Sequence, residues 1–560
     1  MTRHDHLLEQ AVQACRTREH FSPFPDRPGK DEASQAAIAS AKATFESYLG
    51  GRVELDQPAS DEVKAAETSP FTLVPLDIAY PVSDPDTLFA AADEAMAAWA
   101  KVEPERRVDL CLEMVWRLYD RWYEIAHANQ HTTGQSFSMS CVGSGVNALD
   151  RGIEAIAYAA EAMARVPRSG RWERPFGRTP VALDKRFHLR PRGPAVVITC
   201  ASFPTWNAYP ALFANLATGN PVLVKPHPTS VLTMALMVQV AQEVLAEEDL
   251  PTTTVQLAVD TPQQPVAKEL ITHPRCRIVD FTGSPEFGSW IEANAHPAIA
   301  FTETAGVNTV VLESVEDLDP VASAIATSLG LFSAQMCTSV QNLYLPSTGV
   351  RTPDGVIAPD DVVDRIVAAV DATATTPSRA AGLLGAVQSP ATDDLVSQLS
   401  SAAASRGRVA RAGGSYEHPE YPEARTLTPS ITVLEPDDRE LFGQERFGPI
   451  SFAIRCADGQ DALAHAVRDV ADRGSIASHV YSTDPGYQER AKTAYLDAGA
   501  SVSLNLTGPM PLNFAAAYSD YHVTGLSPAG NACLTDEAFI AGRFRVAQVR
   551  EPAPQSRSDG

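Results

Sequence analysis

The sequence has few basic residues and no long hydrophobic run. Lys and Arg number 45 against 69 Asp and Glu, so the formal net charge is −24. A nucleic-acid-binding protein needs a basic surface, and this deficit argues against that class. No stretch reaches the roughly 18 consecutive apolar residues of a membrane-spanning helix. The first residues, Met1-Thr-Arg-His-Asp-His, lack the apolar core of a signal peptide. We therefore expect a cytoplasmic protein that binds neither nucleic acid nor membrane.

Paired cysteines are also missing. The chain has 8 cysteines, and none of them forms a C-x-x-C pair. This spacing argues against a structural zinc site and against a disulfide framework, so we expect no metal. One thiol then remains a candidate for chemistry, while the others fill space in the core.

The order of predicted elements indicates an α/β protein. At about 150 residues per domain, 560 residues correspond to three or four domains' worth of chain. Residues 1 to 70 are polar, and there we expect a helix from about residue 7 followed by an irregular segment. Apolar spacing predicts helices over about 86–101, 104–129 and 146–165. Strand-like segments at 195–199, 221–225, 254–259 and 276–281 then alternate with helices, and a second alternating block covers 308–503. This pattern predicts doubly wound sheets with helices on both faces.

Two segments alternate apolar and basic residues, Arg186-Phe-His-Leu-Arg-Pro-Arg and Arg543-Phe-Arg-Val-Ala-Gln-Val-Arg. Each is typical of an exposed strand whose charges protect its edge. A surface hairpin and a strand that pairs subunits are both compatible with this pattern.

Two motifs could hold a nucleotide. In Phe281-Thr-Gly-Ser-Pro-Glu-Phe-Gly288 a strand ends and a helix begins at Gly283 and Ser284. Backbone N–H groups at such a helix start bind phosphate, and glycine permits close approach. Lys225 follows a buried strand at the carboxyl edge of the predicted sheet, where α/β folds bind nucleotides. Taken alone, the first motif is also typical of an ordinary helix cap, and Lys225 of a solvated surface lysine.

Two further residues could carry catalysis. Glu303, in Phe301-Thr-Glu-Thr-Ala-Gly306, stands among small and apolar residues and is a candidate general base. Cys337, in Ser333-Ala-Gln-Met-Cys-Thr-Ser, is a candidate nucleophile. Each residue alone is equally typical of a protein interior. A cysteine hydrolase would pair a histidine with Cys337, but no histidine has motif support, and we expect none there.

The combination of these motifs resembles the aldehyde dehydrogenase superfamily. Phe-Thr-Gly-Ser, Glu303, Gln-x-Cys337 and Glu445-Arg-Phe-Gly-Pro449 follow one another in the family's order from about residue 80 to about 548. The resemblance implies that Cys337 attacks the aldehyde and that Glu303 activates the water that hydrolyses the thioester. It also implies that Lys225 binds the adenine-side ribose, that Gly283 and Ser284 hold the pyrophosphate, and that Glu445 and Phe447 contact the nicotinamide end.

The same resemblance implies a division of the chain and an assembly. Residues 1–70 are then an N-terminal extension, 71–180 and 192–304 a Rossmann-like NAD(P)-binding domain, and 305–505 an α/β catalytic domain. A small β ribbon of 181–191 and 541–552 would join subunits into a homodimer or a larger homo-oligomer. An aldehyde is the implied substrate.

Two departures from the family pattern affect the expected chemistry. Counting back from Lys225, the family's oxyanion-binding Asn falls on Ser202, whereas Asn207 is five residues out of register. We expect Ser202 to donate to the oxyanion, with Asn207 as the alternative. NAD-preferring members often carry a Glu three residues after the Lys, and Pro228 stands there. Because no Glu stands at this position, no carboxylate there repels the 2′-phosphate of NADP. We therefore expect NADP, with NAD as the alternative.

Within the superfamily, Ala201-Ser-Phe-Pro-Thr-Trp-Asn207 and the long N-terminus resemble the phenylacetic-acid-degradation (PaaN-like) branch. The implied substrate is a CoA-linked semialdehyde of the 3-oxo-5,6-dehydrosuberyl-CoA semialdehyde type. About ten residues follow the last strand, so we expect ring opening by a separate hydratase. Two alternatives stay open: a CoA-acylating dehydrogenase, which generally lacks the Glu, and a nucleotide-binding protein without activity.

Overall fold

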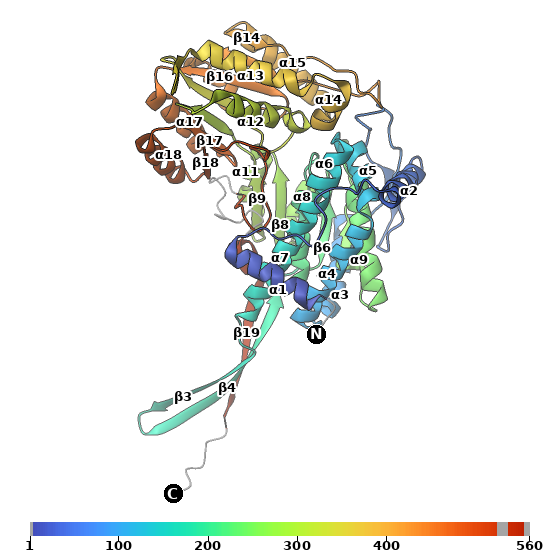
Figure 1. Ribbon diagram of the computed structural model, residues 1–560. Coiled ribbons are helices and arrows are strands. Elements are labelled where there is room, and N and C mark those ends of the chain that lie inside the picture. The colour runs from blue at the N-terminus through green and yellow to red at the C-terminus, as the bar shows by residue number, and fades with distance from the viewer. Residues whose placement is uncertain (1–3, 523–535, 554–560) are drawn as a thin grey trace.

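The computed structural model describes residues 4–522 and 536–553. Two α/β bodies, each built on its own sheet, lie one against the other, and a narrow ribbon projects from the lower body (Figure 1). This arrangement confirms the predicted fold class.

The first sheet has five strands in the order β7 (Val255–Leu257), β6 (Val222–Lys225), β5 (Ala195–Ile198), β8 (Ile278–Gly283) and β9 (Ile299–Thr304). All four pairings are parallel. Side chains of a strand alternate between its two faces, and here both faces are covered. Ala195 and Val197 pack in one cluster with α7 (Asn147–Ala164), α8 (Pro204–Ala217) and α9 (Leu232–Glu247). Val196 and Ile198 pack in the other with α3 (Pro85–Trp99), α10 (Ala267–Thr272) and α11 (Pro285–Asn294).

The second sheet has seven strands in the order β14 (Arg408–Arg411), β15 (Ser430–Leu434), β16 (Ile450–Cys456), β11 (Asn342–Pro346), β10 (Thr309–Leu312), β17 (Ser478–Tyr481) and β18 (Val502–Leu504). Only the β14–β15 pairing among these is antiparallel. On one face, α12 (Leu318–Gly330) and α13 (Pro359–Thr373) cover the sheet. On the other lie α17 (Gly459–Arg473) and α18 (Pro485–Asp497). Near the sheet edge lie α14 (Pro377–Leu384) and α15 (Pro390–Ala404).

The projecting ribbon has three antiparallel strands, β19 (Phe544–Pro552), β4 (Thr179–Pro191) and β3 (Ser169–Phe176). The two segments with alternating basic residues are therefore strands, as predicted, and they pair with each other from Phe544 opposite Pro191 onward. The ribbon already begins at Ser169, so the predicted boundary at residue 180 is wrong. β19 and β3 pair with β4 on either side, and the three strands extend beyond the globular body (Figure 1).

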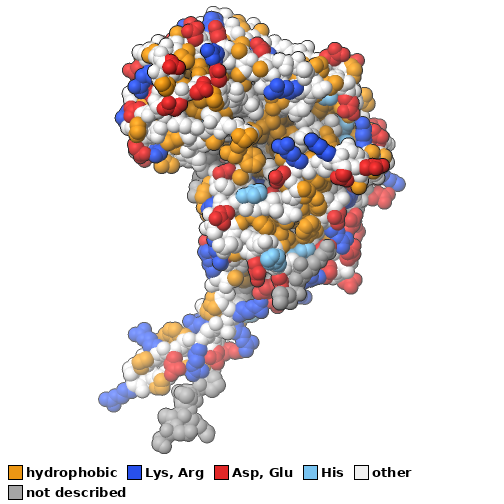
Figure 2. All heavy atoms as spheres, viewed as in Figure 1, with side chains coloured by type: hydrophobic (Ala, Val, Ile, Leu, Met, Phe, Trp, Pro, Cys, Tyr) orange, Lys and Arg blue, Asp and Glu red, His pale blue; other side chains and the backbone are white. Residues whose placement is uncertain are grey.

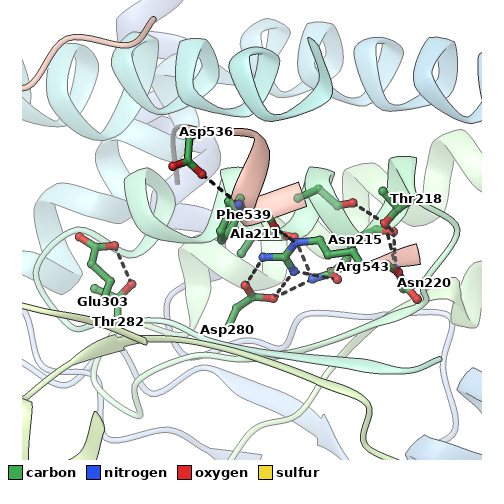
Figure 3. Close-up of polar contacts among 11 residues, drawn as sticks. Ala211, Asn215, Thr218, Asn220, Asp280, Thr282, Glu303, Asp536, Phe539 and Arg543 are labelled. Atoms are coloured by element: carbon green, nitrogen blue, oxygen red, sulfur yellow. Dashed lines mark hydrogen bonds and ion pairs between the residues drawn. The ribbon is translucent and has the colours of Figure 1, made fainter. Parts of the chain in front are cut away.

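A buried ion pair fixes the base of the ribbon. The guanidinium of Arg543, directly before β19, donates from Nη2 to Asp280 Oδ1 at 2.6 Å and from Nη1 to Asn215 Oδ1 at 2.9 Å (Figure 3). Asp280 lies on β8 and Asn215 on α8, so the C-terminal strand is tied to the centre of the first sheet. A buried charge is tolerated when its partners are complete, as they are here.

The N-terminal region differs from the prediction in two places. The segment expected to be irregular contains α2 (Glu32–Tyr48), which Asp31 caps by accepting from the Ser34 N–H. Of this helix only Phe45 is buried, so it carries no apolar stripe that sequence periodicity could reveal. The helix expected over 104–129 is broken at Arg121 (φ −99°, ψ 17°) into α4 (Pro104–Asp120) and α5 (Trp122–Thr133). The first helix, α1 (Asp5–Thr17), is confirmed.

Short elements complete the N-terminal half: β1 (Asp61–Lys64) pairs with β2 (Ala79–Val82), and α6 (Phe137–Cys141) precedes α7. In the described residues, every helix is too short or too polar to cross a membrane. Acidic and basic side chains are interspersed over the face shown in Figure 2, and several charged residues of both signs lie on the ribbon.

Candidate active site

A cavity of about 540 Å³ contains the thiol predicted to be the nucleophile. Most of its wall is apolar. Its lining residues include Arg27, Phe203, Trp206, Asn207, Cys337 and His522. Arg27 comes from the N-terminal extension, Trp206 and Asn207 from α8, and Cys337 from the loop between α12 and β11. No Asp or Glu is among the described residues that line it.

A turn of unusual conformation presents Cys337 to this cavity. Phe332, Ser333 and Ala334 have φ values of 50°, 49° and 51°, in the left-handed region that residues with a Cβ rarely adopt. The Ser333 hydroxyl donates to the carbonyls of Leu384 and Leu427, both at 3.1 Å, and so holds the turn. Backbone strain of this kind is found at functional sites, where surrounding contacts maintain it.

Hydrogen bonds fix the backbone on both sides of the thiol. Asn308 Nδ2 donates to the Cys337 carbonyl at 2.7 Å, and Thr338 Oγ1 donates to the Asn513 carbonyl at 2.7 Å. Burial raises the pKa of the Cys337 thiol well above its usual value, and the nearby Glu303, Cys200 and Glu445 raise it further. The free thiol is therefore protonated near neutral pH, and the site needs a group that accepts its proton.

The carboxylate of Glu303, on β9, accepts two hydrogen bonds through one oxygen, and its other oxygen lies beside a histidine without forming a hydrogen bond. Its Oε2 accepts from Asn207 Nδ2 at 3.1 Å and from Thr282 Oγ1 at 3.2 Å, the latter drawn in Figure 3. Its Oε1 lies 2.7 Å from His522 Nε2. A carboxylate with this many partners keeps a fixed position beside the cavity.

A histidine stands beside both reactive groups. His522 Nε2 is 3.6 Å from Cys337 Sγ and 2.7 Å from Glu303 Oε1. The expectation that no histidine accompanies Cys337 is therefore wrong. His522 lies 185 residues beyond Cys337 and has no motif around it, so only the tertiary structure brings the two together. The thiol of Cys337, a carboxylate oxygen of Glu303 and a ring nitrogen of His522 lie within 4.8 Å of one another, a separation that suits a shared proton.

The structure places the two candidate oxyanion donors differently. Asn207 lines the cavity that contains Cys337, and its NH2 group has a second hydrogen beyond the one given to Glu303. Ser202 does not line the cavity. Its carbonyl accepts from Gln135 Nε2 at 2.7 Å, and its hydroxyl interacts with the thiol of Cys200. The geometry therefore favours Asn207, although the sequence register favours Ser202.

The predicted nucleotide residues gather at the carboxyl edge of the first sheet. Lys225 ends β6 and lies level with Ile198 of β5, which in turn lies level with Phe281 of β8. Gly283 ends β8, and Ser284 caps the exposed start of α11 by accepting from the Phe287 N–H. The buried Thr199 hydroxyl, next to Lys225, has no hydrogen-bond partner in the structure. An open helix start, a lysine and an unpaired hydroxyl at one edge fit a dinucleotide.

The motif alone would allow Lys225 to be a solvated surface lysine, but in the structure it is buried and paired. Its ammonium lies 2.8 Å from Asp260 Oδ1, and both side chains are almost completely buried. Asp260 follows β7, two strands from the centre of the sheet, and no motif marks it.

Glu445 and Phe447 border a small cavity together with Met336, the neighbour of Cys337. Burial raises the pKa of the Glu445 carboxyl to about 7. Since Glu445 also raises the pKa of the Cys337 thiol, the two groups are close enough to interact. The Glu-x-Phe-Gly-Pro motif thus lies near Cys337, beside its neighbour Met336.

Comparison with known proteins decides the family. The model of the "Aldehyde dehydrogenase family" matches residues 77–506, more than three-quarters of the chain. This protein belongs to the aldehyde dehydrogenase family. As a family member it is an oxidoreductase, and the position of Glu303 within 4.8 Å of the Cys337 thiol is compatible with that chemistry.

Among solved structures, this aldehyde dehydrogenase is similar to an NAD-dependent aldehyde dehydrogenase from Burkholderia multivorans. The two chains are 41% identical, each is 99% covered, and the TM-score is 0.95. A 1-pyrroline-5-carboxylate dehydrogenase from Bacillus cytotoxicus is 26% identical over 390 residues, which cover 67% of this chain and 69% of that one. A Thermus thermophilus 1-pyrroline-5-carboxylate dehydrogenase structure, 20% identical with a TM-score of 0.74 and coverage of 96% and 99%, shows the shared fold.

Proposed function

We propose that this enzyme oxidises an aldehyde to a carboxylic acid through a thioester on Cys337. The observation that carries the proposal is the proximity of the two groups: a Glu303 carboxylate oxygen lies within 4.8 Å of Cys337 Sγ, and Cys337 lines a mostly apolar cavity. The thiolate adds to the aldehyde carbon, and the Asn207 amide donates to the oxygen that becomes negative. After oxidation, Glu303 takes a proton from the water that attacks the thioester carbonyl. The C–S bond then breaks with its electron pair on sulfur, the carboxylic acid leaves, and Glu303 gives its proton to solvent.

The oxidant in this proposal is a nicotinamide dinucleotide, which accepts the hydride when bound. Lys225 and Thr199 would contact the adenine-side ribose, and the α11 start at Gly283 and Ser284 the pyrophosphate. Glu445 and Phe447 would orient the nicotinamide end toward Cys337. A CoA-acylating reaction would need no general base, so the firmly held Glu303 favours hydrolysis.

The nucleotide is NAD in our proposal, contrary to the expectation from Pro228. The Asp260 carboxylate beside Lys225 supplies the acceptor that the missing Glu would have supplied. A buried carboxylate there accepts from a ribose hydroxyl and repels a 2′-phosphate. The similar chain from Burkholderia multivorans is described as NAD-dependent, which supports this choice.

Replacing Asp260 tests this choice. We expect Asp260→Asn to shift the ratio of NAD to NADP affinity toward NADP by about 10- to 100-fold, because an ionic hydrogen bond is worth about 1.5–3 kcal/mol. Dissociation constants measured by calorimetry without aldehyde report binding independently of turnover. Glu269→Gln, an exposed change on α10, serves as the control. A ratio within about twofold of wild type would contradict the role of Asp260.

The cavity also indicates a substrate class. Its wall is mainly apolar, and Arg27 is the only Lys or Arg among the described lining residues. Its guanidinium is exposed to solvent. An elongated aldehyde with an anionic far end fits this lining, since the chain packs on apolar groups and the anion pairs with Arg27. A CoA-linked semialdehyde of the phenylacetate type, formed by a separate hydratase, has this chemistry and is our proposed substrate.

One experiment tests both the reaction and the substrate class. We expect nucleotide reduction with a medium-chain aldehyde that does not depend on free CoA, and a lower KM when the aldehyde carries a terminal carboxylate. Arg27→Gln should raise the KM for the carboxylate-bearing aldehyde about two- to fivefold and leave the KM for the neutral aldehyde unchanged. Reduction that requires free CoA would replace hydrolysis with acylation. Equal KM values for both aldehydes would contradict the role of Arg27.

We also propose that the first sheet and its helices form the NAD(P)-binding domain and that the second sheet forms the catalytic domain. The ribbon joins subunits into a homodimer or a larger assembly, for which its exposed Val546 and Val549 provide apolar contact.

A further inference from the structure

We propose that His522 is a further catalytic residue, which takes the thiol proton of Cys337 and stabilises the thiolate. The inference rests on the proposed function, in which Cys337 is the nucleophile. It starts from two contacts of a single nitrogen: His522 Nε2 lies 3.6 Å from Cys337 Sγ and 2.7 Å from Glu303 Oε1.

The surroundings of the thiol explain why it needs such a partner. Cys337 is half-buried, and the nearby ionisable groups Glu303, Glu445 and Cys200 are each anionic or neutral and oppose its ionisation. A thiolate formed there without a nearby cation would repel both carboxylates in a region of low dielectric constant. His522 is the one described group beside the thiol that can become positively charged.

The geometry allows a balanced proton transfer. The S–H bond of Cys337 breaks, an N–H bond forms at Nε2, the sulfur becomes anionic and the imidazole cationic. That N–H then donates to Sγ of Cys337, and the positive charge of the imidazole lies 2.7 Å from Oε1 of Glu303, so that both anions stabilise it. Oε2 of Glu303 keeps its bonds to Asn207 and Thr282. When water hydrolyses the thioester, the proton returns from Nε2 to the departing sulfur, so His522 ends the cycle neutral.

Side chains from two helical regions hold the segment before His522 in place. Arg151 Nη2 donates to the carbonyl of Ala516 at 3.1 Å, and Arg18 Nη2 to that of Ser519 at 3.2 Å. Arg18 also stands over the ring of Tyr521 at 4.2 Å. The Trp206 ring packs edge-on against the His522 ring, with centroids 4.8 Å apart.

These contacts give the N-terminal extension a role that its sequence does not indicate. Arg18 directly follows α1, where it adopts the left-handed conformation (φ 61°) that ends the helix. The extension thereby positions the 516–522 segment, and Arg18 is a positioning residue.

The test measures thiolate formation directly. Wild type and His522→Gln, both without nucleotide, are treated with iodoacetamide between pH 6 and 10, and labelling of Cys337 is followed by mass spectrometry. We expect the variant to be labelled about 10²-fold more slowly at pH 7.5, with the midpoint of its pH profile displaced upward. Imidazole added to His522→Ala should restore part of the labelling rate. The exposed His20→Gln is the control and should behave as wild type.

The profile reports on a small set of groups. The groups near the proton that Cys337 and His522 exchange are Glu303, Glu445 and Cys200. The Arg151 guanidinium lies beyond Trp206, 5.0 Å from the Trp206 ring. Arg18→Met should lower the labelling rate in the same direction by a smaller factor, since it loosens the segment without removing the imidazole.

Two results separate this inference from the proposed function. A His522→Gln enzyme that melts at the wild-type temperature and is labelled at the wild-type rate overturns the role of His522 only. Unlabelled Cys337 in wild type, together with aldehyde turnover, overturns the assignment of the nucleophile. If His522→Gln does not fold, His522→Asn is measured in the same way and judged by the same criterion.

Discussion

Cys337→Ser is expected to abolish nucleotide reduction while leaving nucleotide affinity unchanged. We expect a loss of at least about 10⁴-fold in kcat, in line with the removal of other covalent nucleophiles. A serine hydroxyl is a far weaker acid than a thiol, and burial beside Glu303 and Glu445 opposes its ionisation as it opposes that of Cys337. Nucleotide binding should survive, because Lys225, Asp260 and the α11 start lie in the first body and do not contact the sulfur.

Reduction is measured from the absorbance of the reduced nicotinamide, and affinity by calorimetry. Cys456→Ser replaces a buried thiol, on β16 in the second sheet, and should retain wild-type turnover. Retained turnover in Cys337→Ser would refute the assignment of the nucleophile. Loss of turnover in Cys456→Ser as well would point instead to a general sensitivity to cysteine replacement.

Glu303→Gln is expected to separate the two half-reactions. Glutamine keeps the size of the side chain but cannot take a proton from water, so hydrolysis of the thioester should slow by about 10²- to 10³-fold. Oxidation should then proceed once per site, as a rapid burst of reduced nucleotide followed by a slow phase. The acyl-enzyme should accumulate on Cys337.

Intact-protein mass spectrometry after mixing with aldehyde and nucleotide detects that adduct. The doubly substituted Cys337→Ser, Glu303→Gln protein is the control, because no adduct can form without the thiol. Normal steady-state turnover with no adduct would show that another group, such as water held by Asn207, performs the hydrolysis. If Glu303→Gln instead slows the burst itself, Glu303 acts mainly on the thiol, through its contact with His522.

Local patterns predicted much of the fold. The short apolar segments at Ala195 and Val222 are strands because a parallel strand covered on both faces must be apolar at successive positions. The helix start at Ser284 followed from the capping preference of serine. By contrast, α2 was missed because an exposed, alanine-rich helix carries no apolar stripe. The break at Arg121 was missed because both halves continue one apolar pattern.

Some residues of the candidate site could be predicted from local motifs, and others could not. Cys337, Glu303 and Glu445 stand in motifs short enough to be recognised along the chain, and the structure brings them to one place. For the oxyanion donor, counting residues favoured Ser202, but the turn into α8 directs Asn207 into the cavity. Residue counts do not determine which side chain a loop presents.

The sequence by itself determined the family, the alternation of strands and helices, and the thiol and carboxylate on which the chemistry rests, because each depends on neighbouring residues or a short motif. Only the tertiary structure decided that Asp260 pairs with Lys225, that Arg27 reaches the cavity, and that His522 stands between Cys337 and Glu303. These residues come from distant segments, which packing of the sheets and of the N-terminal extension brings together. Their electrostatic effects depend on distance in space and on burial, and neither is encoded in the local order of residues.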